Sequence, residues 1–407
     1  MPSILDRLKP AEPVGRDVWF LLFVVGTAFM ASRYDFQFTT LALPKFQASL
    51  ALTDKQVADI TAIAKLGAVP AVIATFMADR IGRKPLFLWS IIGFCAAAVM
   101  ASLAQGPISL TTALFLTRFF TMVDELLAVV LLVEAAPPLA RGWMIGALSA
   151  CGALGDGLAL ALYGLFADSS PDAWRWLYAA GALPALLTVW WRMKMPESQT
   201  FEATRSEGDL TASQIRALRE VWRPAALVFV AAFLFWVPLS PALSFIPQHL
   251  QAGQGWSSAQ VSGLILVAGT VGLIGTFAGG ALADRFGRRT VAVGGTVLAG
   301  IGLAGVYGGL SGGVIMASYT LGLAGWFGAS VALKALMAET VPASVRGTMA
   351  GLTEIANTMG AVTGITLVGQ LAGAGQSIGA GTLTVLPVIG LAVVAMLLLR
   401  ETRGRSA

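Results

Sequence analysis

The chain has 407 residues, of which 56% are hydrophobic and only 12% are charged. Because soluble globular domains carry about 25% charged residues, this composition excludes an ordinary soluble domain and predicts an all-α membrane protein. The net charge of +5 is explained by positively charged loops on one side of a membrane. It therefore implies no nucleic-acid partner.

A membrane-spanning helix needs about 20 consecutive apolar residues. Division of the chain at its charged and Gly- or Pro-rich breaks predicts twelve such helices. In chain order they cover residues 17–43, 55–78, 85–104, 107–135, 141–167, 173–193, 223–250, 258–282, 290–309, 312–340, 347–372 and 379–399.

The distribution of Lys and Arg between the loops predicts the orientation. Loops on the side of the two termini contain Arg80, Arg83, Lys84, Arg141, Arg285, Arg288, Arg289 and Arg346. The opposite loops contain only Lys45, Lys55 and Arg175. The positive-inside rule then predicts that both termini are cytoplasmic, in a multi-pass protein of the cell inner (plasma) membrane. The first segment contains Arg33 and Asp35, so we expect it to remain as a helix and not to be cleaved as a signal peptide.

An internal repeat divides the chain. Residues 79–84 match 284–289 at an offset of 205, residues 134–142 match 339–347 at the same offset, and Gly155 matches Gly360. Two parallel six-helix halves imply a substrate site between them and alternating access. The predicted regions are an N-terminus (1–16), a first bundle (17–193), a linker (194–222), a second bundle (223–399) and a C-terminus (400–407).

The repeated motifs carry a family resemblance. Ala78-Asp79-Arg80-x-Gly82-Arg83-Lys84 and the fuller copy at 280–289 resemble the loop 2–3 motif of the major facilitator superfamily. The segment 134–142, its second copy, Met195-Pro196-Glu197-Ser198 and Glu401-Thr402-Arg403-Gly404 are similar to the group that holds sugar porters, organic-ion transporters and metabolite:proton symporters. The resemblance implies two pseudo-symmetric six-helix bundles, secondary active transport without enzymatic activity, and a monomer.

The charges of the repeated motifs are interpreted as parts of a gate. An Asp at the end of a helix can pair with an arginine or lie at a helix N-terminus, and Glu134 with Arg141 and Glu339 with Arg346 are candidate latches. The alternative is that these charges only set topology and end helices. The predicted gating residues are Asp79, Arg80, Arg83, Glu134, Arg141, Asp284, Arg285, Arg288, Glu339 and Arg346.

Charges that occur in only one half are candidates for function. An ionisable residue inside the membrane costs about 2.5–3.5 kcal/mol on insertion scales, so a charge that the repeat does not share needs its own explanation. We compared charged residues inside the predicted helices with the residue 205 positions away in the other half. The residues singled out in this way, which have no charged counterpart, are Asp35, Lys65, Arg118, Asp124, Glu125, Asp156, Lys334 and Glu354.

Four of these residues are predicted to couple transport to protons. In proton-coupled members of the resembled group, an acid in helix 1 and an arginine in helix 4 often work as a pair, which implies such a role for Asp35 and Arg118. A nearby arginine stabilises the charged carboxylate, and separation of the pair would let it take a proton. Glu125 shares a helical face with Arg118 and is an alternative partner, with Asp124 beside it. Alternatively, Arg33 simply neutralises Asp35.

The candidate substrate site combines a cation with aromatic residues. Lys334 shares a helical face with Trp326 and Ser330, and a lone ammonium there would suit a carboxylate; the alternative is an internal ion pair to Asp124, Glu125 or Glu354. A single asparagine in the whole chain weighs against a sugar. Aromatic residues would line an apolar pocket, unless they face lipid. The predicted substrate contacts are Lys334, Arg118, Trp236, Trp326, Asn357 and Glu354.

The sequence has one histidine, no cysteine cluster and no ATP-binding motif, so we expect no metal, no cofactor and energy from ion gradients. The predicted function is proton-coupled symport of a small aromatic or other carboxylate anion, with the substrate, protons and the lipid bilayer as partners. Two alternatives stay open. One is proton-coupled efflux of an amphiphilic compound, and the other is a transport-dead receptor or membrane scaffold.

Overall fold

The computed structural model describes residues 12–194, 222–309, 312–341 and 346–402, except for the side chains of residues 76–81 and 187. Within these ranges every regular element is a helix and no strand occurs. The predicted all-α fold class is confirmed.

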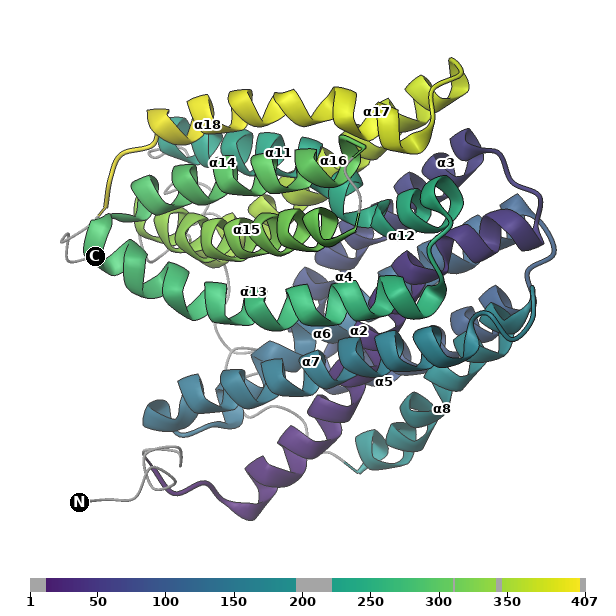
Figure 1. Ribbon diagram of the computed structural model, residues 1–407. Coiled ribbons are helices and arrows are strands. Elements are labelled where there is room, and N and C mark those ends of the chain that lie inside the picture. Colours follow the sequence, from purple (N-terminus) through teal and green to yellow (C-terminus); the bar gives the residue numbers. More distant parts are fainter. Residues whose placement is uncertain (1–11, 195–221, 310–311, 342–345, 403–407) are drawn as a thin grey trace, which may run out of the picture. The chain divides into compact units, whose positions relative to one another are not determined.

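The helices of the first half begin and end close to the predicted boundaries (Figure 1). Residues 55–78 form two helices because the chain breaks at Gly67. The elements are α2 (Arg16–Ser49), α3 (Asp54–Leu66), α4 (Ala68–Ile81), α5 (Arg83–Ser102), α6 (Pro107–Ala135), η1 (Pro138–Ala140), α7 (Arg141–Phe166) and α8 (Ala173–Met193).

The second half repeats this pattern. Its first and last predicted segments are each composed of several consecutive helical pieces. The elements are α11 (Trp222–Ser244), α12 (Ile246–Gln248), η2 (His249–Gly253), α13 (Ser258–Phe286), α14 (Arg288–Tyr307), α15 (Gly313–Thr340), α16 (Arg346–Gly373), α17 (Ile378–Val385), η4 (Leu386–Val388) and α18 (Ile389–Leu398).

Ten helical segments of the described chain are long and apolar enough to cross a membrane. This number is lower than the predicted twelve because α6 and α8 are not among them. The interior of α6 carries Arg118, Asp124 and Glu125, the residues that the sequence singles out for function. These ionisable residues interrupt the apolar length of the helix that carries most functional candidates.

The chain folds into two compact units. Of the described residues, the first unit comprises 12–42 and 67–194, and the second comprises 43–66, 222–309, 312–341 and 346–402. The second unit therefore includes the end of α2 and all of α3, which belong to the first half of the sequence.

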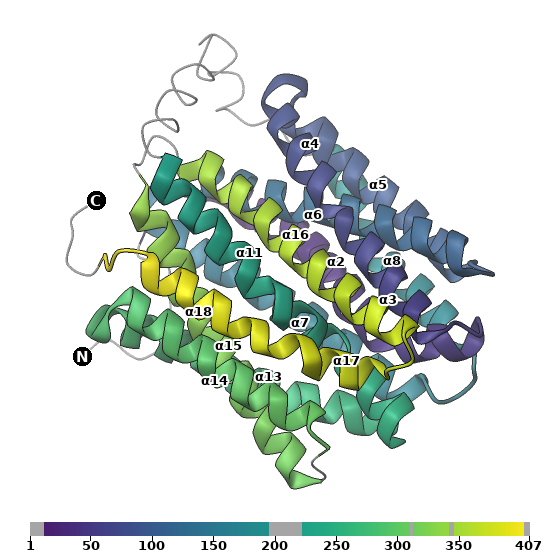
Figure 2. The ribbon, with the colours of Figure 1, turned by 90° about the horizontal axis from the view of Figure 1, so that it is seen from above.

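Small residues explain why α3 packs within the second unit. A Cβ atom on Gly369 of α16 would lie 2.9 Å from the Cβ of Ala58, and one on Gly373 would lie 3.0 Å from Cδ of Lys55. Glycine therefore lets α3 lie closely along α16 (Figure 2). At the start of α3, Asp54 accepts hydrogen bonds from Gln47 (2.6 Å) and from the backbone N–H of Ile378 (3.4 Å).

The same glycine contact occurs once in each unit. A Cβ on Gly155 of α7 would lie 3.0 Å from the carbonyl carbon and 3.1 Å from the Cα of Met30 on α2. A Cβ on Gly360 of α16 would meet Phe233 of α11 at the same two distances. The prediction that Gly155 and Gly360 are equivalent is supported by this geometry.

This contact also corrects the sequence register. The offset between α7 and α16 is 205, but between Met30 and Phe233 it is 203. The pairing of Asp35 with Ser240, which a uniform offset of 205 gives, is therefore wrong, and Asp35 corresponds to Pro238. Arg33 corresponds to Trp236. Asp35 remains a charge of one half only.

A second repeated feature is the turn that precedes α5 and α14. Gly82 adopts φ 108° and ψ 143°, and Gly287 adopts φ 106° and ψ 145°. Side chains rarely tolerate this positive φ, so glycine is required at both positions. The turn is the same in the two halves at the offset of 205.

We expect Gly155→Ala to lower the thermal stability of the detergent-purified protein. The new methyl group would strike the Met30 backbone and force α2 away from α7, and overpacking of this kind costs about 1–3 kcal/mol. Gly157→Ala is the matched control, because a Cβ there has no atom within 4 Å. Equal melting temperatures for the two variants would contradict the packing described here.

Candidate functional site

Asp35 is a carboxyl buried in the first unit. It lies on α2 with a relative exposure of 6% and is hydrogen-bonded to the hydroxyl of Tyr178 on α8. The same hydroxyl lies 2.5 Å from Thr39 and also bonds Thr117 of α6. The Tyr178 hydroxyl, itself held by Thr39 and Thr117, therefore positions the Asp35 side chain.

Arg118 lies near Asp35 but does not contact it. The charge of Arg118 acts on Asp35 electrostatically, yet the described chain contains no ion pair between the two. The Arg118 guanidinium donates to the sulfur of Met122 (3.6 Å) and lies 5.0 Å from the ring centre of Phe36. The structure thus brings Asp35 and Arg118 close together. The direct neighbour of Asp35 is Tyr178, whereas those of Arg118 are Met122 and Phe36.

Arg33 is bound to a different acid from the one considered in the sequence. Its Nη2 lies 2.8 Å from Oδ2 of Asp156 on α7, and its guanidinium lies 5.3 Å from the ring centre of Phe36. The alternative that Arg33 simply neutralises Asp35 is therefore not supported. Glu125, half-buried on α6, acts electrostatically on both Arg33 and Asp35.

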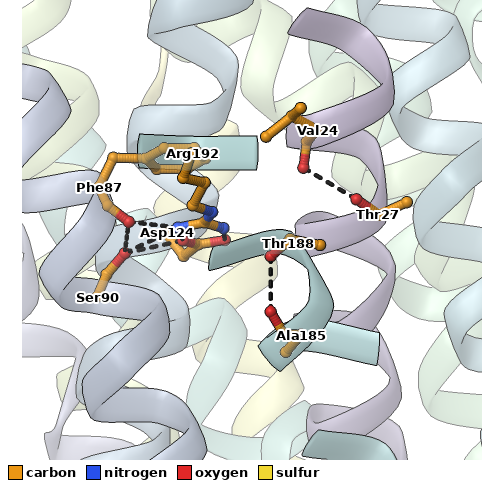
Figure 3. Close-up of polar contacts among 8 residues, drawn as sticks. All are labelled: Val24, Thr27, Phe87, Ser90, Asp124, Ala185, Thr188 and Arg192. Atoms are coloured by element: carbon orange, nitrogen blue, oxygen red, sulfur yellow. Dashed lines mark hydrogen bonds and ion pairs between the residues drawn. The ribbon is translucent and has the colours of Figure 1, made fainter. Parts of the chain in front are cut away.

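Asp124 belongs to a separate and fully buried ion pair (Figure 3). Arg192 of α8 donates from Nη1 to Oδ1 of Asp124 (2.6 Å) and from Nη2 to Oδ2 (3.0 Å), and both side chains are 1% exposed. Ser90 of α5 donates to the same carboxylate (2.8 Å), and Arg192 also donates to the carbonyl of Phe87. The pair ties α5, α6 and α8 together.

Sequence reasoning missed Arg192 because it lies at the end of a predicted helix, next to the linker. A usable signal was present, since the residue 205 positions further on is Leu397. Arg192 is therefore a charge of one half only, like its partner Asp124.

The second unit contains a row of aromatic side chains. The ring centres of Trp236 and Trp326 are 6.1 Å apart, those of Phe235 and Trp236 are 6.0 Å apart, and those of Trp326 and Phe327 are 4.6 Å apart. Trp236 lies on α11 and Trp326 on α15, so the row connects these two helices.

Polar atoms near this row have no partners of their own. The Trp326 Nε1 and the hydroxyl oxygens of Ser330 and Ser240 are buried and make no hydrogen bond within the described residues. Buried polar groups are normally hydrogen-bonded, so these atoms are available to a ligand.

Of the other predicted substrate contacts, Asn357 and Glu354 bond each other, whereas Lys334 has no ion-pair partner among the described residues. Lys334 is exposed and forms no ion pair in the part of the chain that the structure describes. The predicted alternative of an internal ion pair for Lys334 is thus not observed. On α16, Asn357 donates to Glu354 (3.2 Å), one helical turn away.

The repeated gate motif forms equivalent contacts in the two halves. Arg83 at the start of α5 is ion-paired with Glu134 near the end of α6. Arg288 at the start of α14 donates from Nε to Glu339 near the end of α15 (3.4 Å). Both partners are related by the offset of 205, so this contact is part of the shared scaffold.

The predicted latch partners are wrong. Arg141 instead donates to the carbonyl of Ala136 (3.4 Å), and Arg346 donates to the carbonyl of Ala338 (3.0 Å). Each arginine therefore binds a carbonyl group at or near the end of the preceding helix, where cations are favoured by the helix dipole.

The second unit adds further contacts at this gate. Asp284 is ion-paired with Arg288 (2.5 Å), and Arg285 is exposed over the ring of Phe286. Glu401 accepts hydrogen bonds from the backbone N–H groups of Arg288 (2.8 Å) and Arg289 (3.0 Å), and Thr402 donates to Glu339. The side chains of two predicted gate residues, Asp79 and Arg80, lie outside the described residues.

We expect Asp124→Ala to destabilise the protein strongly, because it leaves the Arg192 guanidinium buried without its partner. Removal of one member of a buried ion pair costs about 3–5 kcal/mol. The double variant Asp124→Leu/Arg192→Met removes both charges and should recover most of the loss. Melting temperatures in detergent would check this, and a double variant as unstable as Asp124→Ala would contradict a closed structural pair.

Comparison with known proteins agrees with this architecture. The chain is 26% identical over 398 residues to the 3-(3-hydroxy-phenyl)propionate transporter of Escherichia coli (strain K12), with 95% of each chain covered. It is 27% identical over 396 residues to the probable 4-methylmuconolactone transporter of Cupriavidus pinatubonensis, with coverage of 91% and 88%. The structure of a bacterial homologue of the human lysosomal transporter Spinster superposes with a TM-score of 0.77 at 16% identity, over 95% of this chain and 98% of that one.

The family model described as Major Facilitator Superfamily matches residues 19–365 and 244–406. These matches span both halves of the sequence and include every helix that carries a candidate residue. The chain belongs to the major facilitator superfamily of transporters.

Proposed function

We propose that the protein is a proton-coupled symporter that carries a small aromatic or other carboxylate anion across the inner membrane, with both termini in the cytoplasm. One observation carries the proposal. Among the described residues, the buried acid Asp35 of the first unit has no ion-pair partner, and the cation Lys334 of the second unit has no anion. A proton would neutralise Asp35, and a substrate carboxylate would pair with Lys334.

The surroundings of Asp35 suit reversible protonation. A carboxyl that is hydrogen-bonded to a tyrosine hydroxyl can be held in place in either protonation state, because the hydroxyl donates to the carboxylate and accepts from the protonated acid. Arg118 is close enough to favour the charged form but is not locked to it. A small movement of Arg118 would therefore change the proton affinity of Asp35.

The surroundings of Lys334 suit an aromatic acid. Trp326, Ser330 and Lys334 lie at four-residue intervals on α15, so they share one face over about 12 Å of helix. The Trp326 N–H and the Ser330 hydroxyl are unpaired, and the aromatic row offers a stacking surface. Two relatives whose names refer to a hydroxyphenylpropionate and a methylmuconolactone support this substrate class.

The test is uptake into liposomes of purified protein under an acid-outside pH gradient. The panel contains radiolabelled 3-(3-hydroxyphenyl)propionate, 3-phenylpropionate, benzoate, xylose and a cationic dye. We expect uptake of the acids only, and loss of accumulation when a protonophore removes the gradient. Accumulation that ignores the protonophore would exclude proton coupling, dye transport would favour the efflux alternative, and no flux at all would favour a receptor.

The same assay tests the anion site with matched variants. Lys334→Gln should raise the KM for every acid about tenfold or more, because a charge-assisted contact is lost, whereas Lys334→Arg should keep most of the affinity. Trp326→Phe keeps the ring but removes the N–H, so it should weaken acids that carry a ring hydroxyl more than benzoate. An unchanged KM in Lys334→Gln would remove Lys334 from the site.

A further inference from the structure

The hydroxyl group of Tyr178 is the centre of a buried hydrogen-bond network in the first unit. It bonds the carboxyl of Asp35, lies 2.5 Å from the hydroxyl of Thr39 on α2, and bonds the hydroxyl of Thr117 on α6. Tyr178 and Thr117 are each 2% exposed, so their polar atoms depend on protein partners. We call Asp35, Thr39, Thr117 and Tyr178 the hydroxyl network.

The supply of donors and acceptors determines how the hydroxyl network is bonded when Asp35 is ionised. A carboxylate only accepts hydrogen bonds, whereas a phenol donates one hydrogen and its oxygen also accepts. The Tyr178 hydrogen therefore goes to Asp35, and the hydroxyls of Thr39 and Thr117 donate to the Tyr178 oxygen. Every donor of the hydroxyl network then has an acceptor.

Protonation of Asp35 reverses the first of these bonds. The protonated carboxyl donates to the Tyr178 oxygen, and the Tyr178 hydrogen must turn to the oxygen of one of the two threonines. The threonine that receives it needs a second acceptor for its own hydrogen. Because a buried donor without an acceptor is costly, the location of a second acceptor decides which threonine can respond.

Thr117 has this second acceptor within reach. Its Oγ1 lies 3.0 Å from the carbonyl oxygen of Leu114, about one turn earlier on α6. Among the described residues, Thr39 has no hydrogen-bond partner other than Tyr178. Thr117 can therefore donate either to Tyr178 or to Leu114 while its oxygen stays beside Tyr178, and Thr39 cannot make the same exchange.

The second half of the sequence does not repeat the hydroxyl network. With the offset of 203 for α2 and of 205 for α6 and α8, the corresponding residues are Pro238, Ala242, Gly322 and Leu383. None of these side chains has a hydroxyl or carboxyl group. The hydroxyl network is therefore not part of the shared scaffold, which distinguishes it from the gate contacts of Arg83 and Arg288.

We propose that Thr117 is a positioning residue of the proton-coupling site: when Asp35 takes up a proton, the Thr117 hydroxyl turns from Tyr178 to the carbonyl of Leu114 and accepts the Tyr178 hydrogen. Every donor of the hydroxyl network is then bonded in both protonation states of Asp35. The proton comes from water and adds to a carboxylate oxygen. The hydroxyl groups only rotate, so no O–H bond breaks. This inference rests on the proposed proton symport through Asp35.

The charged groups around Asp35 are kept in every variant of the test below. They are Arg118 and Glu125 on α6, and the ion pair of Arg33 with Asp156 between α2 and α7. The neutral phenols beside Asp35 are Tyr34 on α2 and Tyr178 on α8. A difference between variants in their response to pH therefore reports the hydroxyl network and not a change of neighbouring charge.

The test measures exchange of labelled for unlabelled acid in liposomes with the same pH on both sides. The acid is the member of the panel that wild-type protein accumulates most, and the pH is varied over a range in which this acid stays ionised. Exchange through a proton-bound carrier should fall as the pH rises and Asp35 loses its proton. The measured quantity is the pH of half-maximal exchange.

Thr117→Val keeps the shape of the side chain but removes its hydroxyl. The carboxylate form of Asp35 keeps its bond from Tyr178, whereas in the protonated form the Tyr178 hydrogen has lost its acceptor. Because an unsatisfied buried donor disfavours this form, half-maximal exchange should shift to lower pH by about one unit. Thr117→Ser keeps the hydroxyl and should retain the wild-type value.

Tyr178→Phe should shift half-maximal exchange in the opposite direction. It removes the donor from the carboxylate form of Asp35, and bonds to charged groups are stronger than those between neutral groups, so exchange should persist to higher pH by about one unit. Thr188→Val on α8 is the matched control, because Thr188 is buried and donates within its own helix to Ala185 (2.7 Å). Its half-maximal pH should equal that of wild type.

Two results would overturn the proposal. One is an equal half-maximal pH for wild type and Thr117→Val, and the other is a shift of Thr117→Val and Tyr178→Phe in the same direction, which indicates a structural effect. If the melting temperature shows that Thr117→Val does not fold, Thr117→Ala takes its place with the same expected shift.

Failure of the symport itself has a different result. Wild-type exchange that does not depend on pH, together with the absence of proton-driven accumulation, would reject the proposed symport and this inference with it. Wild-type exchange that depends on pH, with no shift in Thr117→Val, would reject only the role of Thr117.

Discussion

A charged side chain inside a bilayer is stable only if it is paired, shared or neutralised, and this constraint organises the interior of the first unit. Asp124 and Arg192 satisfy it with a closed bidentate pair at 1% exposure. Arg33 satisfies it by bonding Asp156 and lying against Phe36. Asp35 is bonded to the hydroxyl of Tyr178 and has no ion pair among the described residues. This environment is the basis of the role proposed for Asp35.

The two halves share a scaffold and differ where function is proposed. The glycine contacts at 155 and 360 agree to within 0.1 Å, and the turns at Gly82 and Gly287 agree to within about 2°. The gate pairs of Arg83 and Arg288 also correspond. At equivalent interior positions, however, Arg33, Glu125 and Asp156 of the first half are replaced by Trp236, Ser330 and Ala361. The first unit is thus charged where the second is aromatic or small.

The helices were predictable because apolar length and Gly or Pro breaks determine them locally. The charged motifs also made the offset of 205 visible. The two-residue shift between α2 and α11 was not predictable, because neither helix carries a shared charged landmark and only the contacts of Gly155 and Gly360 reveal it.

Partners across helices were the least predictable feature of the site. Sequence proximity favoured Arg141 for Glu134, but the fold brings the start of α5 to the end of α6, so Arg83 is the partner. Arg192 lies at the end of a predicted helix beside the linker, and only its lack of a charged counterpart at Leu397 distinguishes it. The hydroxyl group that binds Asp35 belongs to Tyr178, far away in the sequence, and no local pattern indicates it.

We propose that charges shared by both halves operate the gate, whereas Asp35, a charge of one half only, couples transport to protons. The most direct measurement compares Glu339→Gln with Asp35→Asn in one liposome assay of exchange and of gradient-driven accumulation. The account predicts that Glu339→Gln slows both processes by the same factor, and that Asp35→Asn retains exchange while losing accumulation. Proportional losses of exchange and accumulation in both variants would contradict it.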